Sequence, residues 1–133
     1  GDAPLSVLHH HIVEARERER QDVDPRGRQE WLVTRGVAHA LLARRGSRVS
    51  LYDLRESFDA ATGPLPLDFL TAVAAIGDLS CLEPLARAWA ASPEDGWWRQ
   101  RVAEAASGIM SRHHLTRRHG SIRKIRVKWP GFL

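Results

Sequence analysis

A pattern of one glycine, two leucines and one aromatic residue occurs twice in the chain, 31 residues apart. Sliding the sequence by that distance places Gly46, Leu51, Leu54 and Phe58 on Gly77, Leu82, Leu85 and Trp89, and the match fails beyond Gly108. Periods of about 20–50 residues are typical of repeat proteins, in which a unit too small to bury its apolar face alone stacks on the next unit. The spacing therefore predicts a stacked repeat rather than an irregular bundle.

Apolar residues recur three and four positions apart along most of the chain, whereas strict apolar–polar alternation is scarce. That spacing is typical of amphipathic helices. Proline and glycine interrupt it in the segments VDPRG, ATGPLP, SPEDG and WPGF. We therefore predict an all-α fold of about seven helices, over residues 5–20, 28–45, 49–60, 67–76, 79–91, 97–113 and 116–128.

These helices are expected to pack as antiparallel pairs that stack into a short α-solenoid. The helix over 5–20 precedes three pairs, at about 28–60, 67–91 and 97–128, and residues 1–133 form a single domain. A chain of this length can bury roughly two thirds of the surface that it exposes when unfolded. One domain with a core of its own is therefore the expected organisation.

Each helix is expected to bury one apolar stripe. The stripe of the helix over 28–45 consists of Leu32, Val33, Gly36, Val37, Ala40 and Leu41. The first helix presents Leu5, Leu8, Ile12 and Ala15, and the last presents Ile122, Ile125 and Val127. Small residues let two helix backbones approach closely, so contacts of that kind are expected at Ala74, Ala75, Ala105 and Ala106.

The segment over residues 67–110 resembles the bacterial HEAT-like repeats, also called PBS-lyase HEAT-like repeats. The residues that carry this resemblance are Ala72, Ala75, Ile76, Gly77, Asp78, Pro84, Leu85 and Ala88. The resemblance implies a HEAT-like α-solenoid and brings no catalytic residue with it. Because residue 1 is Gly rather than Met, the chain is expected to be the C-terminal fragment of a longer protein.

The composition favours a cytoplasmic protein that does not enter a membrane. A single cysteine excludes an internal disulfide, and no apolar run approaches the roughly 18–20 residues of a membrane span. Cys81 lies among Leu79, Leu82 and Leu85, so we expect it to be buried rather than nucleophilic. Neither the paired carboxylates nor the seven histidines form a catalytic or metal-binding spacing. The sequence thus predicts no enzymatic activity, no cofactor and no metal.

The candidate contact residues lie in the last third of the chain. Residues 112–133 carry seven basic side chains and no acidic one. Six of these basic residues are candidates for binding a partner: Arg117, Arg118, Arg123, Lys124, Arg126 and Lys128. Trp97 and Trp98 are further candidates, because they point about 100° apart on a helix and one of them can anchor the core while the other reaches a partner.

Three functions are compatible with these features. The first is a non-catalytic scaffold that binds a protein partner or neighbouring domains of a longer chain. The second is electrostatic binding of nucleic acid through the basic C-terminal helix. The third, implied by the resemblance alone, is an accessory part of a HEAT-like enzyme. A polar, basic outer face would also suit the terminal repeat of a stack that binds nothing through that helix.

Overall fold

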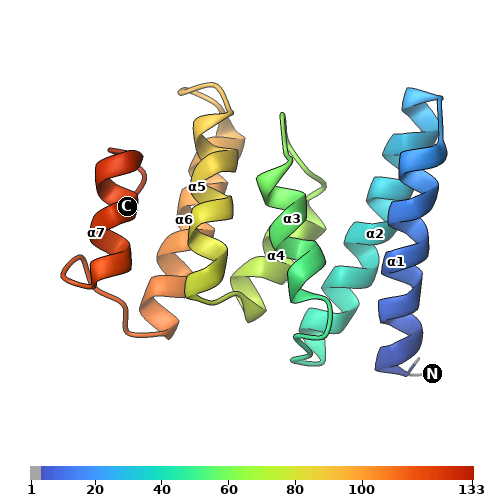
Figure 1. Cartoon of the computed structure of the whole chain (residues 1–133), viewed down its shortest axis with the longest axis horizontal. Helices are drawn as coiled ribbons and strands as arrows, with labels where there is room; N and C mark the ends of the chain where they lie inside the picture. Colours follow the sequence, from blue (N-terminus) through green and yellow to red (C-terminus); the bar gives the residue numbers. More distant parts are fainter. Residues whose placement is uncertain (1–3) are drawn as a thin grey trace. The chain divides into compact units, whose positions relative to one another are not determined.

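The computed structural model describes residues 4–133, and over these residues the protein is all-α, with no strand. Seven α-helices and one 3₁₀ helix follow one another (Figure 1). Their bounds are α1 Leu5–Gln21, α2 Pro25–Arg44, α3 Leu51–Asp59, α4 Leu67–Ile76, η1 Leu79–Cys81, α5 Leu82–Ala90, α6 Trp97–Arg112 and α7 Gly120–Lys128. None of the helices among these residues is long and apolar enough to cross a membrane.

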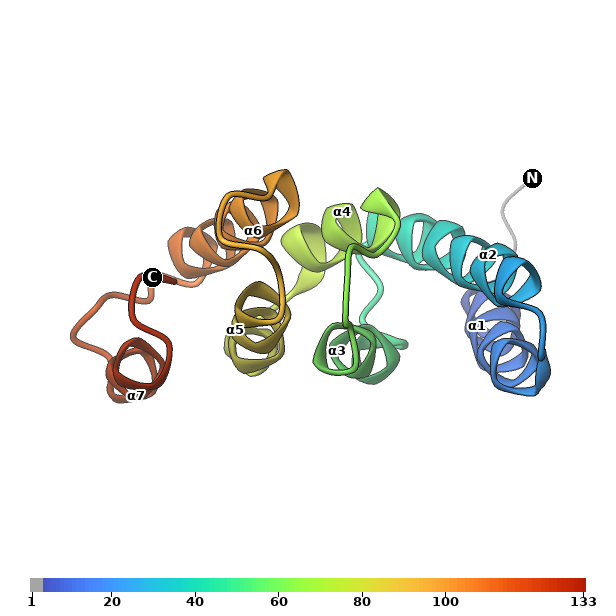
Figure 2. The ribbon, with the colours of Figure 1, turned by 90° about the horizontal axis from the view of Figure 1, so that it is seen from above.

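Backbone contacts divide the chain into two compact units. The first extends to Leu54 and includes Leu65–Ile76, and the second combines Arg55–Pro64 with Gly77–Leu133. In the first unit α1 and α2 form an antiparallel pair, and α4 packs on α2. In the second unit α5 and α6 form an antiparallel pair, and α7 lies beside α5 (Figure 2). The stacking of all pairs into one solenoid stays a prediction.

The 31-residue period reappears in the helix bounds. Moved by 31 residues, α3 (51–59) falls on α5 (82–90) from its first residue to its last. Leu54 and Leu85, which coincide under this shift, are both completely buried. The helix α4 falls on residues 98–107, but α6 continues to Arg112. Gly77 directly follows α4, whereas Gly108, the residue on which it falls, lies inside α6. The longer helix therefore explains why the match fails beyond Gly108.

The predicted inward face of α2 is confirmed at Gly36, which is buried, and is wrong at three of its apolar residues. Val33, Val37 and Leu41 are 40–46% exposed, whereas the buried face carries Arg35, Gly36, Ala38, His39, Leu42 and Ala43. The helix also begins at Pro25 rather than at residue 28, because proline is tolerated in a first turn and Asp24 caps that turn by accepting a hydrogen bond from the Arg26 N–H.

Several smaller expectations also fail. Leu5 is 38% exposed and Val127 is 83% exposed, so neither belongs to a core. Ala75 is exposed and does not mediate a close helix approach. The close approach occurs instead at Gly36, where an added Cβ would lie 2.9 Å from Cε2 of Phe69 on α4. The absence of a side chain at Gly36 therefore lets α2 and α4 pack together.

Candidate binding surface

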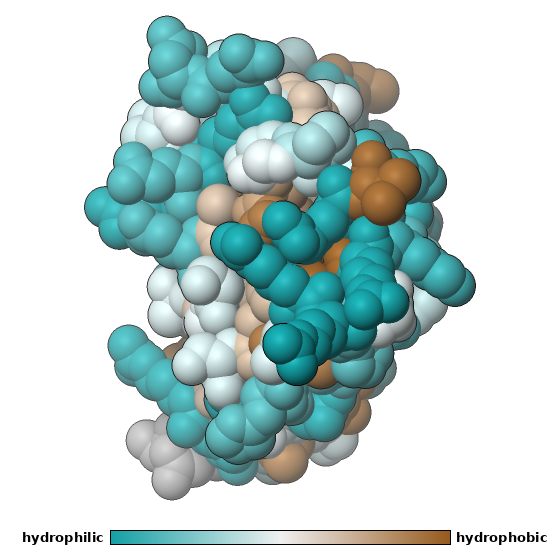
Figure 3. Space-filling model, turned by 90° about the vertical axis from the view of Figure 1, so that its left-hand side faces the viewer, coloured by the Kyte–Doolittle hydropathy of each residue, from teal (hydrophilic) through white to brown (hydrophobic). Residues whose placement is uncertain are grey.

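Six exposed basic side chains gather on α7 and on the loop before it. Arg123, Lys124, Arg126 and Lys128 project from α7, whereas Arg117 and Arg118 lie in the loop, because the helix begins at Gly120 and not at residue 116. We call these six residues the basic surface. Among residues 4–133 no carboxylate forms an ion pair with any of them. Hydrophilic side chains cover most of the side on which α7 lies (Figure 3).

The helix α7 is short, and its own charges oppose one another. Its N-cap is His119, whose Nδ1 accepts a hydrogen bond from the Ser121 N–H at 3.2 Å. Ile122 and Ile125 are buried and attach the helix to its unit. Lys124 and Lys128 are four residues apart on the exposed side, a spacing at which like charges destabilise a helix by about 0.2–0.5 kcal/mol. An anionic partner would relieve this repulsion.

The residues after α7 fold back onto α5 and α6. Gly131 has φ +90°, and the turn that it makes brings Phe132 against Trp89, with ring centroids 5.5 Å apart. On α6, the Arg99 guanidinium carbon lies 3.5 Å from the centre of the Trp89 ring. Phe132 is only 4% exposed. These contacts hold the end of the chain in place beside the basic surface.

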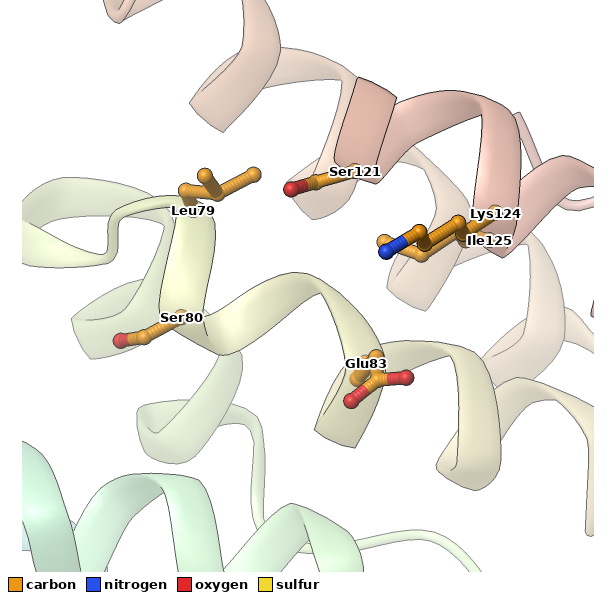
Figure 4. A pocket seen from close by; sticks show the side chains of 6 residues that line it. All are labelled: Leu79, Ser80, Glu83, Ser121, Lys124 and Ile125. Carbon is orange, nitrogen blue, oxygen red and sulfur yellow. The ribbon is translucent and has the colours of Figure 1, made fainter. Parts of the chain in front are cut away.

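A small cavity opens between η1, α5 and the N-terminal half of α7. It has a volume of about 260 Å³, and it is lined by Leu79, Ser80, Glu83, Ser121, Lys124 and Ile125. The Lys124 ammonium group extends into this space from α7, and Glu83 approaches it from α5 (Figure 4). Arg87 lies 3.6 Å from Glu83 and offsets its charge. The Ser80 hydroxyl donates to Asp78 and points away from this space, so the cavity offers the Lys124 cation and the Ser121 hydroxyl (Figure 4).

A larger groove runs along one face of α6. Its volume is about 570 Å³, and the residues that line it include Gln100, Ala103, Ser107 and Met110 of α6 together with Arg117 and Phe132. We call it the α6 groove. Arg117 belongs both to the basic surface and to this groove, so the two features are continuous.

The two neighbouring tryptophans differ in exposure. Trp97 is 55% exposed at the start of α6, whereas Trp98 is 2% exposed and stacks on Phe58 at 6.4 Å. The two rings meet edge to face at 5.9 Å. Trp97 alone can therefore reach a partner, and Trp98 acts as a core residue that positions it.

Sequence reasoning missed a buried charged network in the first unit. Asp53, in the first turn of α3, accepts a hydrogen bond from Arg35 Nη1 at 2.9 Å and also pairs with Arg16 of α1. His39 Nε2 lies 2.7 Å from Asp53 Oδ2, which requires that this nitrogen carries the proton. Arg35 also binds Glu19 of α1 at 3.1 Å. The network therefore links three helices through one carboxylate.

The protonation states in the network follow from burial and charge. Burial alone would raise the pKa of Asp53, but the hydrogen bond from His39 and the positive charges of Arg35 and Arg16 outweigh it and lower the pKa to about 2. Burial lowers the pKa of His39, against the opposing effect of Asp53. His39 and Arg35 are 2% and 3% exposed and cannot reach a ligand. The network thus stabilises the unit and presents no reactive group.

Cys81 is 1% exposed, which confirms the expected burial. Burial also raises the pKa of its thiol, so the nucleophilic thiolate is disfavoured. Asp78 caps the turn before it by accepting a hydrogen bond from the Ser80 N–H at 2.9 Å. Asp78 therefore supports the turn into α5, next to the buried Cys81.

The positions that match the HEAT-like pattern lie on α4, η1 and α5. Gly77 and Asp78 connect α4 to η1, and Pro84 is the third residue of α5, where its missing N–H costs no helical hydrogen bond. Leu85 and Ala88 are buried. No protein family, curated protein or solved structure matches the chain. The resemblance therefore stays a prediction that rests on these residues.

Proposed function

We propose that the protein is a non-catalytic helical-repeat module that binds an acidic surface of a protein partner through its basic surface. The observation that carries this proposal is the set of six exposed cations that have no carboxylate partner among residues 4–133. Charges of this kind steer a partner of opposite sign and fix its orientation. The HEAT-like resemblance supports the same role, since helical repeats present extended binding surfaces.

Two glutamates favour a protein partner over a nucleic acid. Glu83 lines the small cavity beside Lys124, and Glu104 lines the α6 groove beside Arg117. Arg87 and Arg101 offset the charge of these two glutamates, but carboxylates and phosphates both only accept hydrogen bonds, so neither glutamate can bind a phosphate backbone. A protein can instead place carboxylates opposite the cations and neutral groups opposite the glutamates.

The test is affinity capture from a lysate of the cells that express the natural protein, compared between two charge-reversed variants. The first variant carries Arg123→Glu, Lys124→Glu and Lys128→Glu. The matched control carries the same charge change at exposed positions elsewhere, Arg20→Glu, Arg26→Glu and Arg44→Glu. We expect a protein that the wild type and the control capture after nuclease treatment and that the first variant does not. Equal capture by all three would contradict the proposal.

Nucleic-acid binding is the second candidate, and the charge of residues 112–133 favours it. If all six cations contacted phosphates of a duplex, the logarithm of the binding constant would fall against the logarithm of the salt concentration with a slope of about −5. A slope of that size with a DNA or RNA duplex, together with loss of the captured protein after nuclease treatment, would establish this candidate in place of the first.

A further inference from the structure

The α6 groove has the length and the shape of a site for a peptide segment. Its lining residues Gln100, Ala103, Ser107 and Met110 follow one another by three or four positions, so they lie along one face of α6. Ten residues of helix span about 15 Å. A volume of about 570 Å³ spread along that length suits an elongated ligand better than a compact one.

The groove combines an adaptable floor with a fixed wall. Met110 and Ala103 are half-buried on α6, and methionine adjusts to apolar groups of different shape. Phe132 forms part of the opposite wall and is held there by Trp89. Ser107, between Ala103 and Met110, is exposed and small, so it leaves the middle of the groove open.

The charges around the groove favour an acidic ligand. Among residues 4–133, Glu104 is the one acidic side chain that lines it, and its charge is offset by Arg101 at 3.7 Å and by a hydrogen bond from Gln100 at 3.4 Å. Arg117 lies in the lining without a carboxylate partner among residues 4–133. From Arg117 the positive charge continues onto the rest of the basic surface.

We propose that the α6 groove binds an amphipathic acidic helix of the partner, with apolar side chains against Ala103 and Met110 and a carboxylate on Arg117. This inference rests on the proposed function, because the same partner would contact the basic surface. A helix that lies in a groove is held by apolar residues spaced three and four apart, and its acidic residues fix its direction. The proposal thus specifies both the shape and the charge of the partner.

The probe is a fluorescein-labelled synthetic helix with leucine at positions i, i+3, i+4 and i+7 and glutamate elsewhere on its surface. A second peptide keeps every glutamate and replaces each leucine with serine. Binding to the whole chain is measured by fluorescence anisotropy. We expect the leucine peptide to bind at least tenfold more tightly than the serine peptide.

Two variants locate the site. Ser107→Trp fills the groove from an exposed position, and it should weaken binding of the leucine peptide at least tenfold while leaving the serine peptide unchanged. Ser6→Trp, on the exposed side of α1, is the matched control and should change neither. Arg117→Glu, a substitution in the loop before α7, should weaken the binding of both peptides, and it should weaken the binding of the leucine peptide more strongly.

The outcomes separate this inference from the proposed function. If Ser107→Trp binds the leucine peptide as well as the wild type does, the groove is not the site and the inference is wrong. Should Lys128→Glu then weaken both peptides equally, the basic surface still binds acidic chains and the proposed function stands. If neither peptide binds to the wild type, the preference for an acidic partner is refuted as well.

Discussion

His39 on α2 and Asp53 on α3 form a buried pair, with 2.7 Å between His39 Nε2 and Asp53 Oδ2. The Asp53 carboxylate accepts hydrogen bonds from this imidazole and from Arg35, and it forms an ion pair with Arg16. Such a pair stabilises a fold only while both members remain, because a buried charge without its partner is strongly unfavourable. The first unit should therefore depend on each of these residues.

Replacing Asp53 with Asn should lower the free energy of unfolding by about 3 kcal/mol, because the cations lose the anion that neutralises them. About 2 kcal/mol of this corresponds to the fall of the Asp53 pKa from 3.8 to about 2. Since the pKa is lowered in the folded state, this stability is present above about pH 4 and is lost as the pH falls towards 2. Urea unfolding at pH 7 measures the change.

The matched control for that variant is Asp59→Asn. Asp59 pairs with Arg87 at 2.6 Å, but both side chains are more than one third exposed. An exposed pair contributes less than about 1 kcal/mol. If Asp53→Asn and Asp59→Asn lower the free energy of unfolding by similar amounts, the buried network contributes no more to stability than an exposed ion pair does.

The lowered pKa of His39 predicts a loss of stability in mild acid. Below about pH 6.5 the unfolded chain takes up a proton on this residue that the folded chain does not. The free energy of unfolding should therefore fall between pH 7 and pH 5, by up to about 1.4 kcal/mol per pH unit from this residue. His39→Gln keeps a donor to Asp53 and should flatten this part of the profile.

The control for the pH experiment is His10→Gln on α1. The His10 side chain is 75% exposed and lies 3.8 Å from Glu14. Its replacement leaves the His39–Asp53 pair intact, so the fall in the free energy of unfolding between pH 7 and pH 5 should persist. An identical slope in the wild type and in His39→Gln would refute the assignment to His39.

His114→Gly should stabilise the protein by about 0.5–1 kcal/mol. His114 ends α6 with φ +54°, and the next residue, Leu115, donates its N–H to the Met110 carbonyl at 2.8 Å, as in a Schellman motif. This conformation costs a residue other than glycine about 1–2 kcal/mol. That cost exceeds the free energy lost because glycine gives up more conformational entropy on folding. Thermal unfolding followed by circular dichroism measures the gain.

The end of α2 has the same geometry with a glycine in place of the histidine. Gly46 has φ +67°, and the Ser47 N–H donates to the Leu42 carbonyl. Gly46→Ala should destabilise by about 1 kcal/mol, although no atom lies within 4 Å of the added Cβ. If both variants shift stability in the same direction, backbone strain is not the cause.

Cys81 should react with a thiol reagent such as DTNB only as fast as the chain opens. The side chain is 1% exposed, and the raised pKa of the thiol keeps the thiolate scarce. The reaction rate in native buffer should therefore be far below the rate in urea. A rate in native buffer equal to that of the unfolded chain would show that Cys81 is accessible.

Helix spacing and breakers predict most of the secondary structure, and the bounds of α4 agree with the prediction at both ends. The sequence does not predict that Arg35 and His39 lie on the buried face of α2, because both are polar and are buried only through Asp53, which lies 14 or more residues further along the chain. No local pattern reveals a pairing of that kind.

The candidate surface was predictable in composition but not in geometry. The charges of residues 112–133 identify the basic surface directly. The sequence predicts the start of the last helix at residue 116, four residues before Gly120, because histidine is an uncommon N-cap and the residues from Thr116 onward also fit a helical spacing. The groove on α6 depends on Phe132, which reaches it only through the turn at Gly131. Such a return of the chain cannot be inferred from periodicity.

The position of Asp53 also determines where this chain can be divided. The loop after α2 follows the α1–α2 pair and is the first place at which the chain could be cut. A fragment that ended there would keep Arg16, Arg35 and His39 and lose the carboxylate that all three surround. It would also lack Phe69, over whose ring the Arg35 guanidinium lies at 5.2 Å. An expression fragment of the first unit must therefore extend through α4 if it is to fold.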